Sequence, residues 1–294
     1  MSAPDGLLVV DKPAGWTSHD VVGKVRRLAR TRKVGHAGTL DPMATGVLVL
    51  GIGRATRLLG HLALTDKDYD ATLRLGVTTV TDDAEGEPLE TRDASAVTNE
   101  ALAAALAALT GEIDQVPSAV SAVKVGGVRA YARVRAGEDV VLAPRRVTVH
   151  RLELLERRGD DLSLGVTCTS GTYVRALARD LGEALGVGAH LTALRRTRVG
   201  PFGPDVARTL DELAAGEDVV DAAVVRLDDA VAAAFPRRDL TSQDAAALSY
   251  GKRLSVTGQA GVVGAFAPDG RCTALVEDRD GAARPLVVFT PAGA

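Results

Sequence analysis

The sequence has few of the residues that bind metals or redox cofactors. It contains two cysteines in 294 residues, Cys168 and Cys272, and neither belongs to a CxxC pair. Its five histidines are scattered along the chain. Scarce cysteine excludes a disulfide scaffold, and without clustered ligands we expect no zinc or iron–sulfur site. The sequence therefore predicts a protein without metal or cofactor in a reducing cytoplasm.

Long apolar segments are also missing. Runs such as Leu7–Val10 and Val47–Leu50 are far too short to cross a bilayer. At the N-terminus no charged segment leads into an apolar one, so we expect neither a signal peptide nor a membrane anchor. The composition, 46% hydrophobic and 25% charged residues, is that of a globular protein. The length allows one large domain, alone or with a small second one.

Neither sign of charge dominates, because 35 Lys and Arg face 38 Asp and Glu, for a net charge of −3. A protein that coats nucleic acid without preference is usually basic throughout. RNA binding would therefore need cations concentrated on one face. The cations do cluster, at Lys24–Lys33, Arg145-Arg146 and Arg195–Arg198, against acidic stretches at Asp82–Asp93 and Asp205–Asp229. Each cluster alone is typical of a solvated face, whereas the preference for Arg over Lys favours phosphate contacts.

The order of helical and strand-like segments predicts a mixed α+β architecture. Apolar or alternating segments predict strands at Leu7–Val10, Val47–Leu50, Asp70–Gly76, Val147–Leu155 and Leu162–Thr169, the last two forming a hairpin. Helical patterns predict helices from Thr17 or Ser18 to about Ala29, and at Ala55–Leu64, Asn99–Leu109 and Tyr173–Leu185. The helices are too irregularly spaced for a doubly wound sheet. We expect a mixed, mainly antiparallel central sheet flanked by helices.

The composition changes after Phe235-Pro236. A helix is predicted at Ser242–Tyr250, with Ser242 as its cap, followed by short strands divided by PDG and RDG turns. The sequence thus predicts a large domain over residues 1–235 and a small, mostly β domain over residues 236–294.

The segment Gly35–Gly46 (GHAGTLDPMATG) is the most unusual in the chain. Its glycines and prolines and its lack of helical periodicity predict a loop throughout. An isolated Asp-Pro such as Asp41-Pro42 is usually a turn cap. A long polar loop between apolar strands, however, is also a common position for catalytic groups.

A second polar segment, Cys168–Arg175 (CTSGTYVR), contains Tyr173 and Arg175, two positions apart and on one side of an extended chain. Arg175 is either an ordinary surface arginine at a helix start or the partner that keeps a buried carboxylate ionised. Further candidates are Lys67-Asp68-Tyr69, Ser121–Lys124 with Gly126-Gly127, Tyr131 and Arg135, and Gly188–Arg196. Gly51-Ile52-Gly53 is not a dinucleotide motif, because Thr56 stands where the third glycine belongs.

In order and rough spacing these segments resemble the bacterial tRNA pseudouridine-55 synthases, the TruB family. The resemblance rests on Gly6–Ser18 (GLLVVDKPAGWTS), Gly35–Gly46, Lys67–Tyr69, Ser121–Gly126, Gly171–Arg175 (GTYVR) and Gly188–Arg196 (GAHLTALRR). One departure is Val116-Pro117-Ser118, where the family often has two adjacent prolines. The C-terminal residues resemble, more loosely, the PUA-like RNA-binding domain of these enzymes. The resemblance implies the pseudouridine synthase fold and a tRNA substrate bound through its TΨC stem-loop.

The resemblance also implies the roles of individual residues. Asp41 matches the aspartate that initiates rearrangement of the glycosidic bond, and Arg175 matches the arginine paired with it. Tyr69 matches the tyrosine that stacks on the target base and is a proposed proton acceptor. Binding positions are matched by His36, which helps hold the RNA in its base-flipped form, by Tyr173 and Leu194 in the substrate pocket, and by Lys12 with Pro13, which support the active-site loop.

The chemistry implied by the resemblance requires no cofactor. The N1–C1′ bond breaks, the base rotates and C5 joins C1′, with no redox change. Asp41 either attacks C1′ or assists loss of the C2′ proton, and both routes need an ionised carboxylate in a site that excludes water. A base in a folded loop must first be flipped out, at a cost of a few kcal/mol. Phosphate contacts are expected from Lys24–Lys33, Arg145-Arg146 and the C-terminal domain.

Two alternatives remain. The chain could be an RNA-binding factor that folds tRNA without essential catalysis, which would share the basic face and the PUA-like domain. It could also resemble the guide-RNA-directed relatives, which normally carry extra terminal segments and need partner proteins. Because this chain starts within five residues of the first motif, the expectation is a stand-alone, monomeric enzyme without an obligatory protein partner.

Overall fold

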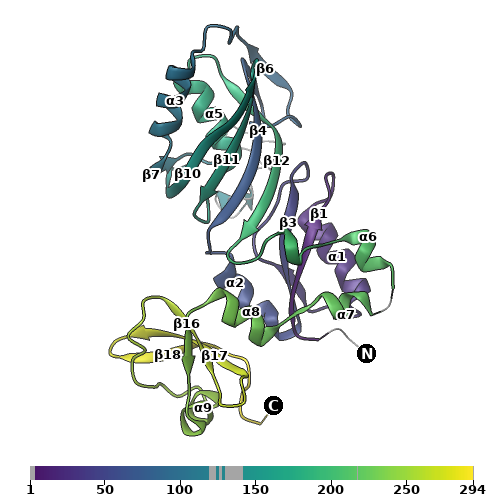
Figure 1. Cartoon of the computed structure of the whole chain (residues 1–294), viewed down its shortest axis with the longest axis vertical. Helices are drawn as coiled ribbons and strands as arrows, with labels where there is room; N and C mark the ends of the chain where they lie inside the picture. Colours follow the sequence, from purple (N-terminus) through teal and green to yellow (C-terminus); the bar gives the residue numbers. More distant parts are fainter. Residues whose placement is uncertain (1–3, 119–123, 126–127, 130–141, 217, 294) are drawn as a thin grey trace.

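The computed structural model describes residues 4–118, 124–125, 128–129, 142–216 and 218–293 (Figure 1). Its largest element is a sheet in the order β13-β1-β3-β12-β4-β11-β10-β7, with β2 paired to β3 and β14 paired to β1. These strands are β1 (Gly6–Lys12), β2 (Val34–His36), β3 (Thr45–Ile52), β4 (Lys67–Leu75), β7 (Gly111–Gln115), β10 (Arg145–Arg158), β11 (Asp161–Cys168), β12 (Ala189–Val199), β13 (Arg208–Thr209) and β14 (Val225–Arg226).

The sheet is mixed and mainly antiparallel, as predicted. Only two of its pairs are parallel among the described residues, β1 with β13 and β12 with β3. Its helices are α1 (Ser18–Leu28), the short α2 (Leu59–Leu62), α3 (Asn99–Ala108), α5 (Val174–Ala184), α6 (Leu210–Ala214), α7 (Val219–Ala223) and α8 (Leu227–Ala234). In Figure 1, α3 and α5 cover one half of the sheet, and α1, α6 and α7 lie beside β1. No described helix is long and apolar enough to span a membrane.

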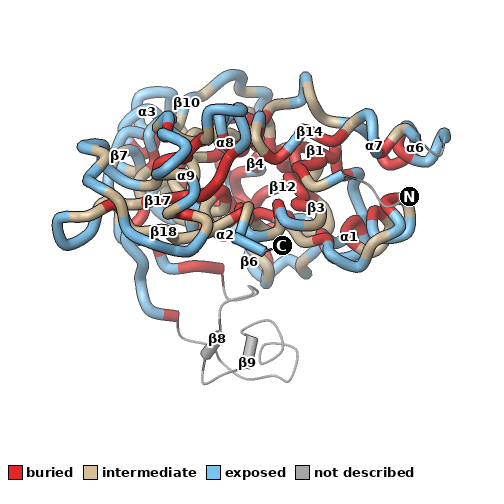
Figure 2. The backbone as a smooth tube through the Cα atoms, turned by 90° about the horizontal axis from the view of Figure 1, so that it is seen from below, coloured by how far each residue is buried: buried red, intermediate tan, exposed pale blue. Residues whose placement is uncertain are grey.

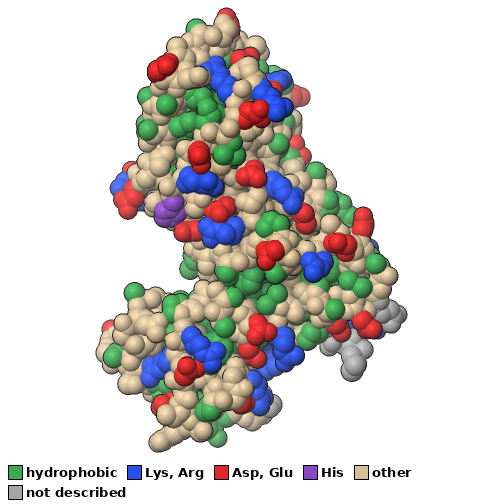
Figure 3. Space-filling view, in the orientation of Figure 1, with side chains coloured by type: hydrophobic (Ala, Val, Ile, Leu, Met, Phe, Trp, Pro, Cys, Tyr) green, Lys and Arg blue, Asp and Glu red, His purple; other side chains and the backbone are tan. Residues whose placement is uncertain are grey.

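A second sheet, in the order β15-β16-β17-β18, lies at the C-terminal end. It comprises β15 (Arg237–Asp239), β16 (Val262–Phe266), β17 (Cys272–Arg279) and β18 (Ala282–Val288), with helix α9 (Ser242–Ser249) beside it. The remaining elements are the hairpins β5 (Val77–Thr79) with β6 (Pro88–Thr91) and β8 (Lys124–Val125) with β9 (Val128–Arg129), and 3₁₀ turns at Gly53–Leu58 and Pro204–Val206. Figure 3 shows the surface hollowed between the two sheets.

Strands β1 and β3 are buried on both faces (Figure 2). On β1, Leu8 and Val10 pack into the core under the helices, whereas Leu7 and Val9 pack into a second core with Phe266 and Leu275 of the small sheet. This two-sided burial explains why β1 is a continuous apolar run rather than an alternating one. The small sheet is thus held against the back of the strands that flank the candidate site.

Several predicted boundaries were wrong. The segment Gly35–Gly46 is not a loop throughout, because strand β2 continues to His36 and β3 starts at Thr45. The helix expected at Ala55–Leu64 is a 3₁₀ turn at Gly53–Leu58 followed by the four residues of α2. The cap of α9 is Thr241, not Ser242, because the Thr241 side chain accepts a hydrogen bond from the main-chain amide of Asp244.

Candidate active site

A cavity of about 270 Å³ lies where the Gly35–Gly46 segment meets the ends of β4 and β12 and the start of α5. Five of the predicted site residues line it: Asp41, Tyr69, Tyr173, Arg175 and Leu194. Its other described lining includes Gly38–Leu40, Lys67, Thr169–Thr172 and Arg196. His36 and Lys12, also predicted as site residues, lie outside this lining. The predicted Ser121–Lys124 segment, with Gly126-Gly127, Tyr131 and Arg135, falls outside the residues whose side chains the structure describes.

Arg175 links two carboxylates at the base of the cavity. Its Nε lies 2.9 Å from Oδ2 of Asp41, and its Nη1 lies 3.4 Å from Oδ2 of Asp83. The same Nη1 donates a hydrogen bond of 2.9 Å to the carbonyl oxygen of Thr81. The Arg175 side chain is only 6% exposed, so a surface role is wrong. A planar guanidinium with several donors suits this bridging geometry, which a lysine cannot reproduce.

Asp83 was missed by the sequence reasoning. It was grouped with the solvated acidic stretch Asp82–Asp93, yet its side chain is only 4% exposed. Its carboxylate accepts hydrogen bonds from the Glu85 amide, at 3.0 Å, and from the Thr81 hydroxyl. Nothing in the local sequence separates Asp83 from its acidic neighbours, because its burial depends on a partner 92 positions along the chain. Asp41 is the more open of the two carboxylates, with 35% of its side chain exposed.

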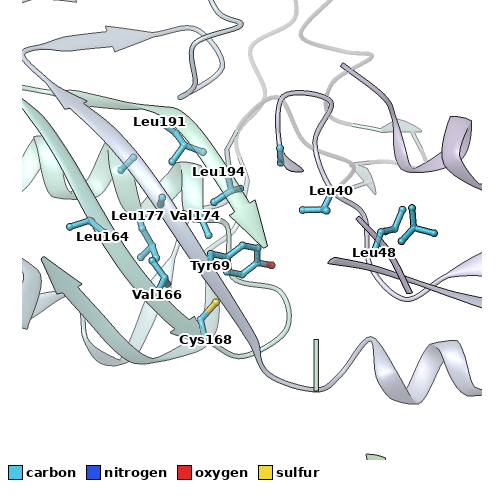
Figure 4. Close-up of a cluster of buried hydrophobic side chains, with 14 of the residues drawn as sticks. Leu40, Leu48, Tyr69, Leu164, Val166, Cys168, Val174, Leu177, Leu191 and Leu194 are labelled. Carbon is cyan, nitrogen blue, oxygen red and sulfur yellow. The ribbon is translucent and has the colours of Figure 1, made fainter. Parts of the chain in front are cut away.

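Tyr69 forms the inner wall of the cavity. It is 8% exposed on β4, and burial raises the pKa of its hydroxyl. Figure 4 shows Leu194 and Val174 beside its ring, with the hydroxyl directed toward the side where Leu40 lies. A buried aromatic ring next to a carboxylate is a suitable surface for a planar base.

Two buried cations fix the position of the segment that carries Asp41. Lys12 is fully buried, and its Nζ donates to the carbonyl oxygens of Pro13, Trp16 and Pro42 at 3.0, 2.6 and 3.1 Å. Burial lowers the Lys12 pKa to about 8. From the opposite side, Arg196 donates to the carbonyl oxygens of Gly38, Thr39 and Val47. Asp41 therefore lies on a short segment whose main-chain carbonyls accept hydrogen bonds from these two side chains, before and after Asp41.

His36 lies at the end of β2, one strand away from the cavity lining. Its ring is edge-on to that of His19 on α1, with centroids 5.5 Å apart. Burial lowers the His36 pKa, and the charge of His19 adds to the effect, so His36 is held neutral. A neutral imidazole beside the Asp41 segment can stack or donate without repelling a cation.

The basic clusters differ in how much charge they expose. In Arg195–Arg198, Arg196 is buried, Arg195 pairs with Asp11 and Arg198 pairs with Asp68, each at 2.7 Å. This cluster is therefore not the exposed cationic patch that its sequence suggested. Figure 3 shows acidic and basic side chains interleaved over the face turned toward the viewer. By contrast, Arg26, Arg27, Arg32 and Lys33 are exposed at the end of α1 and the turn that follows.

Metal ligands do not gather at this or any other described position. No group of three or more His, Cys, Asp or Glu in the described residues has an arrangement that holds a metal ion. The polar groups that line the cavity are a carboxylate, a guanidinium, a phenol, an ammonium and hydroxyls. Such groups can hold a substrate in one orientation and can transfer protons.

Comparisons with known proteins cover nearly the whole chain. Residues 26–174 match the N-terminal domain of TruB family pseudouridylate synthases, residues 175–232 match a tRNA pseudouridylate synthase B C-terminal domain, and residues 235–290 match tRNA Pseudouridine synthase II, C terminal. The chain is 60% identical to tRNA pseudouridine synthase B of Thermobifida fusca, over 97% of this chain and 98% of that protein. It is 56% identical to the Streptomyces coelicolor protein of the same name, over 98% of each chain.

The fold is similar to that of solved structures. A chain in the crystal structure of a Cbf5-Nop10-Gar1 complex superimposes with a TM-score of 0.75 at 28% identity, covering 97% of this chain and 85% of that one. A chain in an H/ACA RNP bound to a substrate RNA containing 2′-deoxyuridine gives a TM-score of 0.74 at 26% identity, covering 98% and 86%.

Proposed function

The chain belongs to the TruB family of pseudouridylate synthases and is a tRNA pseudouridine synthase; from that premise we propose that its target is uridine-55 in the TΨC arm and that Asp41 initiates the reaction. The observation that carries the proposal is the 2.9 Å ion pair between Asp41 and Arg175, beside Tyr69 in one cavity. The pair orients a carboxylate beside a pocket that can accept a single base.

Asp41 and Arg175 have different roles in the reaction. Arg175 binds Oδ2 of Asp41, and the Asp41 side chain stays partly exposed toward the cavity. Asp83 contacts a second nitrogen of the same guanidinium and fixes its orientation. Asp41 then acts on the sugar, either by attacking C1′ or by assisting loss of the C2′ proton. The N1–C1′ bond breaks, C5 joins C1′, C5 loses its proton and N1 takes one up, so that the product is an isomer of the substrate.

The uridine must leave the base stack before Asp41 can reach its sugar. Tyr69 supplies a face for the extruded base and Leu194 and Tyr173 enclose it, all three being in the cavity lining. The bound base covers the open side of Asp41 and excludes water from the carboxylate. His36 occupies the space that the base vacates, and Lys12 keeps the Asp41 segment in place through Pro42.

The rest of the molecule binds the tRNA. We assign phosphate contacts to the exposed cations of Lys24–Lys33 and Arg145-Arg146, and RNA binding to a PUA-like domain over residues 236–294. Arg146 is partly neutralised by ion pairs with Glu112 and Asp114, so Lys24–Lys33 carries more of the contact. Tight tRNA binding through these cations falls steeply with added salt. The enzyme acts as a monomer in the cytoplasm without a protein partner.

The test uses purified protein and an unmodified tRNA transcript, with no nucleotide, metal or second RNA added. Pseudouridine mapped at position 55 is the expected result. Asp41→Asn should bind the transcript with unchanged Kd and form no pseudouridine. Asp160→Asn, in the exposed turn between β10 and β11, is the matched control and should retain full activity. Unchanged modification by Asp41→Asn would refute the role of Asp41, and a strict need for a guide RNA would refute stand-alone action.

A further inference from the structure

The only tryptophan of the chain is exposed. Trp16 precedes α1 and is 36% exposed, in a protein with 3% aromatic residues. Among the described residues, the other large exposed aromatic side chain is Tyr250, far away beside the C-terminal sheet. The exposed part of the tryptophan ring is an aromatic face on which an unpaired base can stack.

Trp16 lines a surface hollow of about 430 Å³ on α1, together with Gly15, His19, Asp20, Gly23 and Arg27. The Asp20 carboxylate accepts hydrogen bonds from the amide and the hydroxyl of Thr17, the residue that caps the helix. Trp16 also lines a second hollow, but there Asp11 and Asp211 are present and Arg195 is already paired with Asp11. The first hollow, with Arg27 at one end and an aromatic ring at the other, is the better match for a polyanion.

Gly23 gives independent evidence that the hollow serves an external partner. It lies in the middle of α1, where glycine costs about 1 kcal/mol relative to alanine. A Cβ at this position would meet nothing within 4 Å, and Gly23 has no positive φ. Neither packing nor backbone conformation therefore requires glycine here. Because glycine has no side chain, nothing from position 23 fills the hollow.

The hollow is connected to the catalytic segment. The Lys12 ammonium joins the carbonyl oxygens of Trp16 and Pro42, and the Gly15 amide donates to the same Pro42 carbonyl at 2.8 Å. His19, in the hollow, contacts the His36 ring. A nucleotide held at Trp16 would therefore lie next to the segment that carries Asp41.

We propose that this hollow is a second nucleotide subsite, which takes an unpaired base of the RNA substrate stacked on the Trp16 ring with a phosphate against Arg27. The inference rests on the proposed function, because it assumes that the occupant is the same RNA that delivers the target uridine. Stacking suits this occupant since it accepts any base, while the neighbouring cations bind the backbone. The hollow thereby adds binding energy outside the cavity where the chemistry takes place.

The first test separates binding from chemistry. Trp16→Ala and Trp16→Leu should raise the KM and the Kd for an unmodified tRNA transcript about 5- to 150-fold, the range of one base–aromatic stack. The kcat should stay within about 2-fold, because Asp41 is not displaced. Trp16→Phe, which keeps an aromatic face, should restore most of the affinity. Leu89→Ala, which trims an exposed leucine on β6, is the control and should change neither constant.

A second variant fills the hollow without removing any contact. Gly23→Leu should weaken tRNA binding at least 5-fold while leaving Tm unchanged or raised, since leucine is the better helix former. The matched control is Ala104→Leu, which adds the same side chain to an exposed position of α3. A weaker binding accompanied by a lower Tm would assign the effect to folding and overturn this part of the argument.

Because Trp16 is the only tryptophan, its fluorescence reports directly on the subsite. Titration of Asp41→Asn protein with the TΨC stem-loop should quench the emission, and an abasic nucleotide at one loop position other than the target should abolish the quench. Wild-type KM in both Trp16→Ala and Gly23→Leu, or a loss confined to kcat, would overturn the subsite. If the wild-type enzyme forms no pseudouridine while the quench and its abasic dependence persist, the proposed function fails and the nucleotide subsite stands.

Discussion

Replacing Arg175 by lysine tests whether the orientation of Asp41, and not merely a positive charge beside it, supports the reaction. The arginine spans Asp41 and Asp83 and also donates to Thr81. A lysine keeps the charge but reaches one carboxylate, and we expect it to choose the more buried Asp83. The variant then loses about one charged and one neutral hydrogen bond, or about 3 kcal/mol of unfolding free energy. Asp41, without its partner, shifts, and a displacement of about 1 Å costs about 100-fold in kcat.

The chain offers a matched control one turn further along the same helix. Arg179 contacts Asp82 and Asp180 at 3.4 and 2.7 Å, but it does not line the cavity. Its side chain is 27% exposed, so Arg179→Lys should lose only about 1 kcal/mol and keep kcat within about 3-fold.

The assay is tritium release from a transcript labelled at uridine C5, because C5 loses its hydrogen when it joins C1′. Stability is measured by urea unfolding and tRNA affinity by filter binding. Arg175→Lys should lower kcat about 100-fold with an unchanged Kd for tRNA. Equal kcat losses in the two lysine variants, or an Arg175→Lys enzyme within 3-fold of wild type, would refute the orienting role.

Three other predictions follow from buried groups. Gly46→Ala should unfold or severely destabilise the protein, because its φ is +97° and a Cβ would collide with the main chain of Arg196; the free energy of unfolding measures this, and a loss under about 1 kcal/mol would contradict it. Lys12→Met should lower kcat more than tRNA affinity, since Pro42 and the segment before it lose their anchor; unaltered kcat would contradict the anchoring. Burial lowers the Lys67 pKa from 10.5 to about 8, so between these values the unfolded chain holds a proton that the folded chain has released, and stability from this group rises with pH. Lys67→Met should flatten the rise by up to about 1.4 kcal/mol per pH unit, as seen in urea unfolding from pH 8 to 10.5.

The sequence predicted those elements that are stabilised by residues close together in the chain. Helix α1 begins as expected, because Thr17 and Asp20 form a capping box that is visible in the sequence. The hairpin of β10 and β11 and helix α3 were also predicted from local patterns. Arg175 and Asp41 could be singled out from motifs, although their separation of 134 positions is closed only by the fold.

The elements that escaped prediction depend on distant partners. Strand β12 contains three arginines in four positions, and that composition suggests a surface rather than a central strand. In the fold one of them is buried against main-chain carbonyls, and the other two meet aspartates from β1 and β4. Likewise, Arg54 and Arg57 in the 3₁₀ turn at Gly53–Leu58 donate to the carbonyls of Phe289 and Val288 at the far end of the chain, which are contacts that no local pattern predicts.

The use of cations inside this fold explains how a chain of net charge −3 can work on RNA. Lys12 and Arg196 hold the Asp41 segment through carbonyl oxygens, and Arg175 holds the Asp41 carboxylate, so these three cations already have partners in the fold. A phosphate close to the cavity would compete for these donors and release Asp41. Binding charge is therefore best carried by cations that do not line the cavity, and the exposed cations at the end of α1 are not among its lining residues. The electrostatics thus separate capture of the tRNA backbone from positioning of the carboxylate.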